Sequence, residues 1–171
     1  MPLCLTFIDL KKAFDAVEKE AVIEAVGNQG VPTQYIRIPR ELYNNFTTRI
    51  SLIYREVIIN VKSGVRQGDT NSPKLFSAAL ENVMRHMEWE SMGVKVDGRY
   101  LHHLRFTDDI MLITPNIEQT EQMLAEFDNA CGKIGFRLNL TKTMFMKNGL
   151  VPDAPFTLNE RIPPNALAMG I

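Results

Sequence analysis

Short apolar runs alternate with longer stretches of helical spacing along the chain, and this order predicts a mixture of strands and helices. Leu3 to Ile8 has the length and composition of a buried strand. Glu18 to Val26 places apolar residues three and four positions apart, which is typical of a helix with one buried face. Thr33 to Asn45 predicts a second helix, and we expect Pro39 to kink or end it, because a proline inside a helix costs about 3 kcal/mol.

The same mixture continues to the end of the chain. The patterns predict two short strands over residues 47–61, a long helix over 73–87 and a hairpin over 94–101. An amphipathic helix over residues 118–134 and a final strand pair over 136–146 follow. Ser72 is the expected N-cap of the long helix and Pro73 its first residue. Asp97-Gly98 is the usual signal for a two-residue hairpin turn.

The stretch from Leu104 to Ile113 places Asp108 and Asp109 between two apolar runs. Adjacent residues of an extended strand point to opposite faces, so the two aspartates are expected at the tip of a tight hairpin. A divalent cation is one counter-charge for this pair, because hard cations take carboxylate oxygens. From this stretch alone a solvated turn remains an alternative. Asp9, which ends the first predicted strand, has a similar alternative as a turn or N-cap residue.

The predicted order is strand, helices, strand hairpin, helix and strand. This order is typical of an α+β fold with a ferredoxin-like antiparallel sheet and helices packed on one face. In that fold the end of the first strand and the tip of the central hairpin lie side by side, which would make Asp9 and Asp108 neighbours. Residues 1–147 are expected to form this domain. Prolines crowd residues 148–171, which are interpreted as an irregular tail.

Composition narrows the function classes. The apolar fraction is 45%, so a buried core is expected. The net charge is −1, so the chain as a whole lacks the positive charge that would favour binding to nucleic acid. Cys4 and Cys131 fall in apolar runs and are interpreted as core residues of a reducing compartment. Neither a membrane helix nor a signal peptide is recognisable. We therefore expect an intracellular protein, in the cytoplasm or nucleus, that is neither secreted nor in a membrane.

Four segments, in order, resemble motifs A, B, C and D of reverse transcriptases: Phe7 to Asp15, Gly64 to Pro73 with Phe76, Phe106 to Asp109, and Gly135 to Lys142. The resemblance covers residues 3–147 and is strongest to non-LTR (LINE-type, RTE-like) retrotransposons. It implies a polymerase palm and an RNA-directed DNA polymerase that uses RNA template, DNA primer and deoxynucleoside triphosphates. Residues 163–171 would be a degraded primer-grip region.

The resemblance also implies a site for two Mg²⁺ ions, with Mn²⁺ as a second candidate ion. Asp9 and Asp108 match the two principal metal ligands and Asp109 matches a third carboxylate. Lys142 matches a lysine proposed to protonate the pyrophosphate leaving group, although a plain surface lysine is the alternative.

Five further positions match nucleotide-binding residues of the family. The backbone of Lys12 and Ala13 would face the triphosphate, and Phe14 matches an aromatic residue that excludes a ribose 2′-hydroxyl. Gln67 would lie beside the nucleotide, while Arg66 would meet a phosphate. The alternatives are a core phenylalanine at position 14 and a solvated arginine at position 66.

Several departures from the family pattern bear on activity. Thr107 replaces an alanine of motif C, and we expect the hairpin to survive because threonine is small and suits strands. The fingers, the thumb and the endonuclease are expected to be missing, so the isolated chain is expected to be inactive. Alternatives are a catalytically inactive remnant or an interaction module with a palm fold. A third alternative, a two-metal nuclease or cyclase on a ferredoxin-like sheet, is disfavoured because motif B would have no role in it.

Overall fold

The computed structural model describes residues 1–44, 47–52, 55–61, 63–66 and 68–157. It forms two compact units. The first, here called the sheet unit, comprises Met1–Lys11 and the chain from Val83 onward, and the second, here called the helical unit, comprises Lys12–Asn82. The sheet unit contains β1 (Cys4–Ile8), β4 (Val94–Val96), β5 (Arg99–Leu101), β6 (His103–Phe106), β7 (Asp109–Thr114), α5 (Ile117–Lys133) and β8 (Met144–Lys147). The helical unit contains α1 (Ala13–Ala16), α2 (Lys19–Asn28), α3 (Thr33–Tyr43), β2 (Thr47–Leu52) and β3 (Arg55–Asn60), and α4 (Ser72–Arg85) begins in it.

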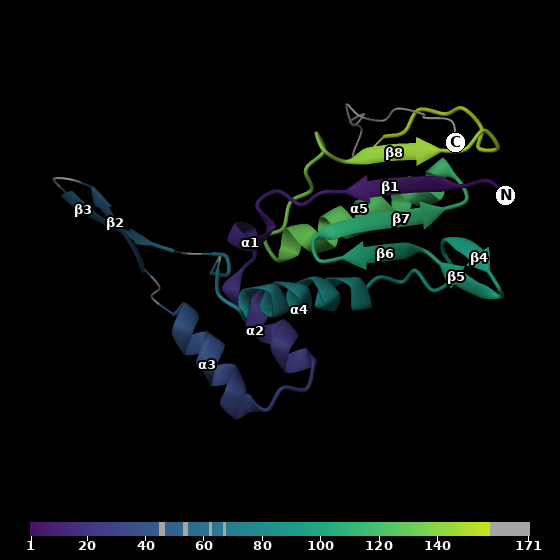
Figure 1. The fold of residues 1–171 in the computed structure, drawn as a ribbon. Helices are drawn as coiled ribbons and strands as arrows, with labels where there is room; N and C mark the ends of the chain where they lie inside the picture. The colour runs from purple at the N-terminus through teal and green to yellow at the C-terminus, as the bar shows by residue number, and fades with distance from the viewer. Residues whose placement is uncertain (45–46, 53–54, 62, 67, 158–171) are drawn as a thin grey trace. The chain divides into compact units, whose positions relative to one another are not determined.

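The sheet unit is built on a four-stranded antiparallel sheet in the order β6-β7-β1-β8 (Figure 1). The first strand therefore lies in the centre, between the second strand of a hairpin and the last strand. Ile8 lies opposite Ile110 of β7, while Phe7 lies opposite Met144 of β8. This interleaved order is that of the ferredoxin-like sheet, so the predicted α+β palm architecture is confirmed.

One face of this sheet is buried against α5, which crosses behind the strands in Figure 1. Alternate residues of β1 supply this face, and Cys4, Thr6 and Ile8 are at most 2% exposed. From α5 the fully buried apolar side chains are those of Met123, Leu124, Phe127 and Cys131. Burying one large apolar side chain contributes about 1.5–3 kcal/mol. Every second residue of β1 and the residues along one face of α5 are buried, and packing these two surfaces together forms this layer.

The opposite face of the sheet is only partly covered. Phe7 and Met111 are half-buried, and Leu104 and Met144 are 50% and 47% exposed. All four belong to one cross-strand row, because Met111 pairs with both Phe7 and Leu104, and Phe7 pairs with Met144. The site residues of the sheet unit lie at one end of this open face.

The predicted final strand pair within residues 136–146 is wrong. β8 pairs with β1, and Leu138 instead makes a single antiparallel bridge to Leu10. The physical reason is that β1 still has an unpaired edge after β7 is added. Pairing with that sheet stabilises two short segments more than an isolated hairpin would, because a lone hairpin is only marginally stable in water.

The helical unit agrees with most predicted elements. Its β2–β3 pair and the start of α4 are as expected, although α4 begins at Ser72, one residue earlier than predicted. The expectation that Pro39 could end the second helix is wrong, since α3 continues to Tyr43. Pro39 removes one helical N–H donor. The packing of α3 against α2 compensates, and Ile36 reaches close to Gly27.

The first ten residues after β8 are irregular, as expected, but they are attached to the sheet unit. Val151 and Phe156 are buried, and Phe156 stacks on Phe145 with ring centroids 4.4 Å apart. The buried ammonium of Lys147 donates to the carbonyl oxygens of Val151 and Pro152 and to the carboxylate of Asp153. The expected primer-grip residues 163–171 lie outside the described residues. In the part of the chain that the structure describes, no helix has the length and apolar character needed to cross a membrane.

Candidate active site

Asp9 follows β1 directly and is held by the turn that precedes β8. The side-chain amide of Asn139 donates to Asp9 Oδ2 at 2.8 Å, and the backbone N–H of Asn139 donates to the Asp9 carbonyl at 2.7 Å. Lys142 Nζ lies 3.7 Å from Asp9 Oδ1. The Asp9 side chain is 35% exposed and that of Lys142 69%, so this ion pair is open to water.

Asp108 and Asp109 lie at the tip of the β6–β7 hairpin, as predicted. Phe106 pairs with Asp109, which leaves Thr107 and Asp108 as the two turn residues. The hairpin is formed with Thr107 in place of alanine, as expected, but Thr107 lies in the turn and not in a strand, and its φ of 56° is in the left-handed region. That region is unfavourable for β-branched side chains, so the turn carries strain next to the carboxylates.

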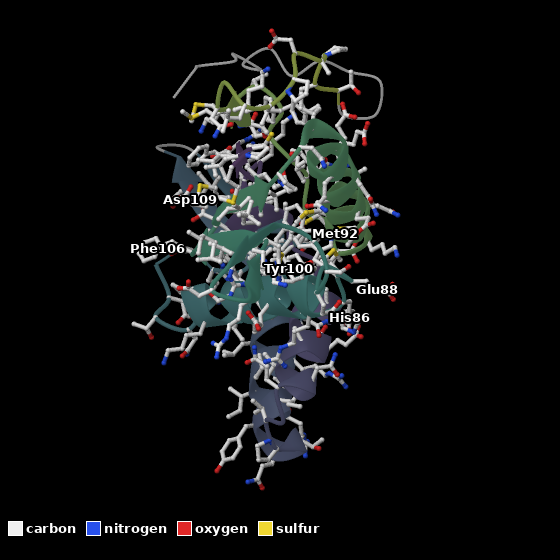
Figure 2. The ribbon with its side chains drawn as sticks, turned by 90° about the vertical axis from the view of Figure 1, so that its right-hand side faces the viewer. His86, Glu88, Met92, Tyr100, Phe106 and Asp109 are labelled. Carbon is white, nitrogen blue, oxygen red and sulfur yellow. The ribbon has the colours of Figure 1, made fainter. Side chains whose placement is uncertain are left out.

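The strand register places Asp9 and Asp109 at the same end of the open face. Ile8 and Ile110 are paired and buried, and Asp9 follows the first while Asp109 precedes the second on the antiparallel strand. Both aspartates therefore project away from the buried face. Figure 2 shows Asp109 and the 82% exposed Phe106 at one edge of the sheet unit.

A cavity of about 760 Å³ opens at this end of the face. Its lining comprises Phe7, Ile8, Asp9, Leu104, Arg105, Phe106, Asp109, Ile110, Met111, Lys142 and Met144. The structure thus brings Asp9, Asp109 and Lys142 together around one space. Asp108, which was expected to be the nearer partner of Asp9, is half-buried in the turn and does not belong to this lining.

The carboxylates that line this cavity are ligands of the kind that magnesium prefers. Magnesium is usually held by one or two carboxylates and completes its shell with water and substrate phosphates. Asp9 and Asp109 supply two carboxylates, and the cavity leaves room for a phosphate group. Among the described residues, no three His, Cys, Asp or Glu side chains are placed to hold a metal ion by themselves. The protein oxygens are therefore suited to an ion that arrives with its substrate.

The expected nucleotide-binding residues lie in the helical unit. Lys12 is left-handed, with φ 45°, and precedes α1, in which Ala13 is buried. Phe14 is half-buried and stacks on Phe76 of α4, with ring centroids 4.6 Å apart. Arg66 is exposed, and Gln67 lies outside the described residues. The core role and the ribose-contacting role of Phe14 are thus both compatible with its position.

Gly64 fastens the loop of motif B to α1. Its N–H donates to the carbonyl of Val17 at 2.7 Å, and the next N–H, that of Val65, donates to the carbonyl of Phe14 at 2.7 Å. A Cβ at Gly64 would lie 2.8 Å from backbone atoms of Phe14 and Asp15. The loop backbone therefore packs directly on the backbone of α1, which brings Phe14 and Arg66 into one loop cluster.

Asn139 is the site residue that the sequence did not single out. The local pattern places it within a predicted strand pair, and only its contact with Asp9, 130 residues away, shows its role. The available signal was weak: a polar residue three positions before Lys142, between two apolar segments.

A family model described as reverse transcriptase (RNA-dependent DNA polymerase) matches residues 2–156. The chain belongs to the reverse transcriptase family. Its relatives include the Retrovirus-related Pol polyproteins from type-1 retrotransposable element R2 of Bradysia coprophila and Nasonia vitripennis. Identity is 29% over 82% of this chain for the first and 28% over 80% for the second. The matched part is only 16% and 13% of those polyproteins.

Solved structures agree on the fold. Telomerase from Candida tropicalis, in complex with a fragment of telomeric RNA, superposes with a TM-score of 0.69 at 16% identity. The superposition covers 86% of this chain and 26% of the telomerase chain. At this identity the likeness concerns the fold alone, and it supports the palm-like α+β architecture.

Proposed function

We propose that this chain is the palm portion of an RNA-directed DNA polymerase from a non-LTR retrotransposon. The observation that carries the proposal is the meeting of Asp9, Asp109 and Lys142 around one cavity, from segments about a hundred residues apart, in a chain of the reverse transcriptase family. An RNA template, a DNA primer and deoxynucleoside triphosphates would be its substrates. The finer assignment to the RTE-like group rests on the motif residues alone, and an intracellular location follows from the proposed activity.

In this proposal the cation is held by Asp9 with the Asp108–Asp109 pair. A bound divalent ion supplies charge neutralisation at the triphosphate and lowers the pKa of the primer hydroxyl. Asp9 and Asp109 orient oxygen ligands toward the cavity, while Asp108 stands beside them in the turn. Lys142 places a proton donor at the cavity wall, where it can reach a leaving phosphate.

Phe14 and Arg66 serve nucleotide selection in the proposal. The Phe14 ring is held on one side by Phe76, which leaves its orientation fixed by stacking. An aromatic ring in a fixed orientation can exclude a ribose 2′-hydroxyl by contact. Arg66, exposed in the loop that Gly64 anchors, would bind a phosphate, and Gln67 and the N–H groups of Lys12 and Ala13 would complete the contacts.

The first experiment measures metal binding to the 171-residue chain. In amide NMR spectra, Mn²⁺ is expected to broaden the signals around Asp9 and Asp109. Asp9→Asn and Asp109→Asn should each weaken this effect at least tenfold, whereas Asp97→Asn, an exposed aspartate of the β4–β5 turn, should not change it. Broadening that is absent, or that is insensitive to Asp9, would contradict the metal site.

The second experiment measures polymerisation. Residues 2–156 replace the matching segment of the Bradysia coprophila R2 polyprotein, and templated DNA synthesis is assayed. We expect synthesis that Asp108→Asn and Asp109→Asn abolish and that Asp97→Asn preserves. A folded chimera that binds Mn²⁺ but makes no DNA would favour a second candidate, a non-catalytic palm module.

A further inference from the structure

The two carboxylate oxygens of Asp9 have different partners. Oδ2 accepts the hydrogen bond from the Asn139 amide at 2.8 Å, and Oδ1 faces the Lys142 ammonium at 3.7 Å. The first contact has hydrogen-bond geometry and is partly buried, whereas the second is a looser ion pair with an exposed lysine. The carboxylate is thus fixed at one oxygen and only loosely neutralised at the other.

Asn139 is itself held from several sides. Its backbone N–H donates to the Asp9 carbonyl, and its side-chain oxygen accepts from the Thr141 hydroxyl at 2.7 Å. Its carbonyl accepts from the N–H groups of Lys142 and Thr143, each at 2.9 Å. Because Thr141 donates to the amide oxygen, the amide nitrogen is the end that faces Asp9. The turn therefore presents one N–H donor to Asp9 in a fixed direction.

The same turn is attached to the end of β1. Leu138 bridges to Leu10, and the N–H of Lys11 donates to the carbonyl of Arg137 at 2.8 Å. Thr143, at the far side of the turn, is fully buried. The backbone of the turn that carries Asn139 and Lys142 is therefore joined to the end of β1 by several hydrogen bonds.

We infer that Asn139 is a positioning residue that directs Asp9 Oδ1 into the cavity, and that Lys142 is a counter-cation of Asp9 that a divalent ion displaces. The inference rests on the proposed function, since it concerns the proposed metal site. An ammonium group and a metal ion compete for the same oxygen, because both are attracted to its negative charge. The Asp9–Lys142 pair is exposed and hence weak, so displacement costs little.

Substitutions at the two residues should change metal affinity in opposite directions. Removing the Asn139 amide frees the carboxylate to rotate, and loss of a partner that orients a metal ligand typically weakens affinity about 10- to 100-fold. Removing the Lys142 ammonium eliminates the competitor. An exposed ion pair of this kind corresponds to roughly a two- to fivefold gain in affinity. A merely structural role would not give opposite signs.

The experiment titrates Mn²⁺ into the 171-residue chain and follows amide broadening near Asp9. Asn139→Ala is compared with Asn129→Ala, an exposed asparagine of α5, and Lys142→Met with Lys133→Met, an exposed lysine at the end of α5. We expect a loss of about tenfold or more for Asn139→Ala. For Lys142→Met we expect roughly a two- to fivefold gain that shrinks at high salt. The two control variants should match the wild type.

A second readout uses the metal-free chain. The ¹³C signal of the Asp9 carboxyl group should shift in Lys142→Met and stay unchanged in Lys133→Met. If Asn139→Ala does not give a dispersed amide spectrum, Asn139→Ser replaces it, because serine keeps a small polar residue in the turn but is too short to reproduce the contact. The same loss of affinity is expected.

The outcomes separate this inference from the proposed function. A wild-type chain that binds no Mn²⁺ overturns the proposed metal site. Binding that depends on Asp9 but is unchanged in Asn139→Ala overturns the role of Asn139. Affinity that stays the same or falls in Lys142→Met, with no shift of the Asp9 carboxyl signal, overturns the role of Lys142.

Discussion

At the scale of single residues, Gly64 is a position that has no room for a side chain. Its φ of 89° is rarely adopted by residues with a side chain, and the backbone of Phe14 and Asp15 fills the place of a Cβ. Gly68, in the same loop, has a φ of 86° but open space around it. A side chain at Gly68 would therefore meet only the cost of the backbone conformation, whereas one at Gly64 would add the cost of a steric clash.

We expect Gly64→Ala to lower the free energy of unfolding by about 3 kcal/mol, because a left-handed alanine costs about 1 kcal/mol and the clash adds roughly 2 kcal/mol. Gly68→Ala should cost only about 1 kcal/mol, the conformational part. Urea denaturation of both variants and the wild type measures the difference. If both variants lost the same unfolding free energy, a Cβ at position 64 would not clash with the backbone of α1.

The sequence identified several site residues but not how they are arranged. The aspartates at positions 9, 108 and 109 became candidate metal ligands through the resemblance to motifs A and C, because the local pattern by itself also fits solvated turn residues. Which of the adjacent aspartates lines the cavity with Asp9 depends on the hairpin register, and that register is set by the pairing of Ile8 with Ile110. Asn139 was not recognisable because its partner is distant in sequence.

At the scale of elements, α5 has the clearest boundary. The Asn116 side chain accepts from the N–H of Gln119 at 2.8 Å, and Thr114 and Thr120 bond through their hydroxyls at the junction with β7. The helix begins at Ile117, one residue before the predicted start. This cap orients the apolar face of α5 toward the sheet.

We expect Asn116→Ala to lower the free energy of unfolding by about 1 kcal/mol, because one N–H of the first helical turn loses its partner. Asn129→Ala, on the exposed surface of the same helix, should change it by less than about 0.5 kcal/mol. Thermal and urea unfolding measure both. A similar change in the two variants would indicate that the cap contributes nothing beyond helix propensity.

At the scale of the whole molecule, the segment after β8 was predicted to lie outside the palm domain. The structure packs residues 148–157 on the sheet unit through Val151, Phe156 and the bonds of Lys147. Asn148 also bonds to Leu3 and to the Met1 carbonyl, so this segment is joined to the residues that precede β1. We therefore regard the segment as structural support for β8.

Chains that end at residue 147 and at residue 157 test this role, since both lack residues 158–171. The shorter chain should be less stable by about 4 kcal/mol or more, because it exposes two buried apolar contacts and leaves the buried Lys147 ammonium without acceptors. Urea denaturation midpoints measure the difference. Equal midpoints would instead support a domain boundary at residue 147.

The local pattern of the sequence determined the strands, most helices, the hairpin turns and the four family motifs. These features depend on neighbouring residues, whose periodicity and turn chemistry can be read directly. Only the tertiary structure decided that β8 pairs with β1 and that Asn139 and Lys142 share the carboxylate of Asp9. Each of these depends on contacts between distant segments, and such contacts are selected by the total packing and hydrogen bonding of the folded chain.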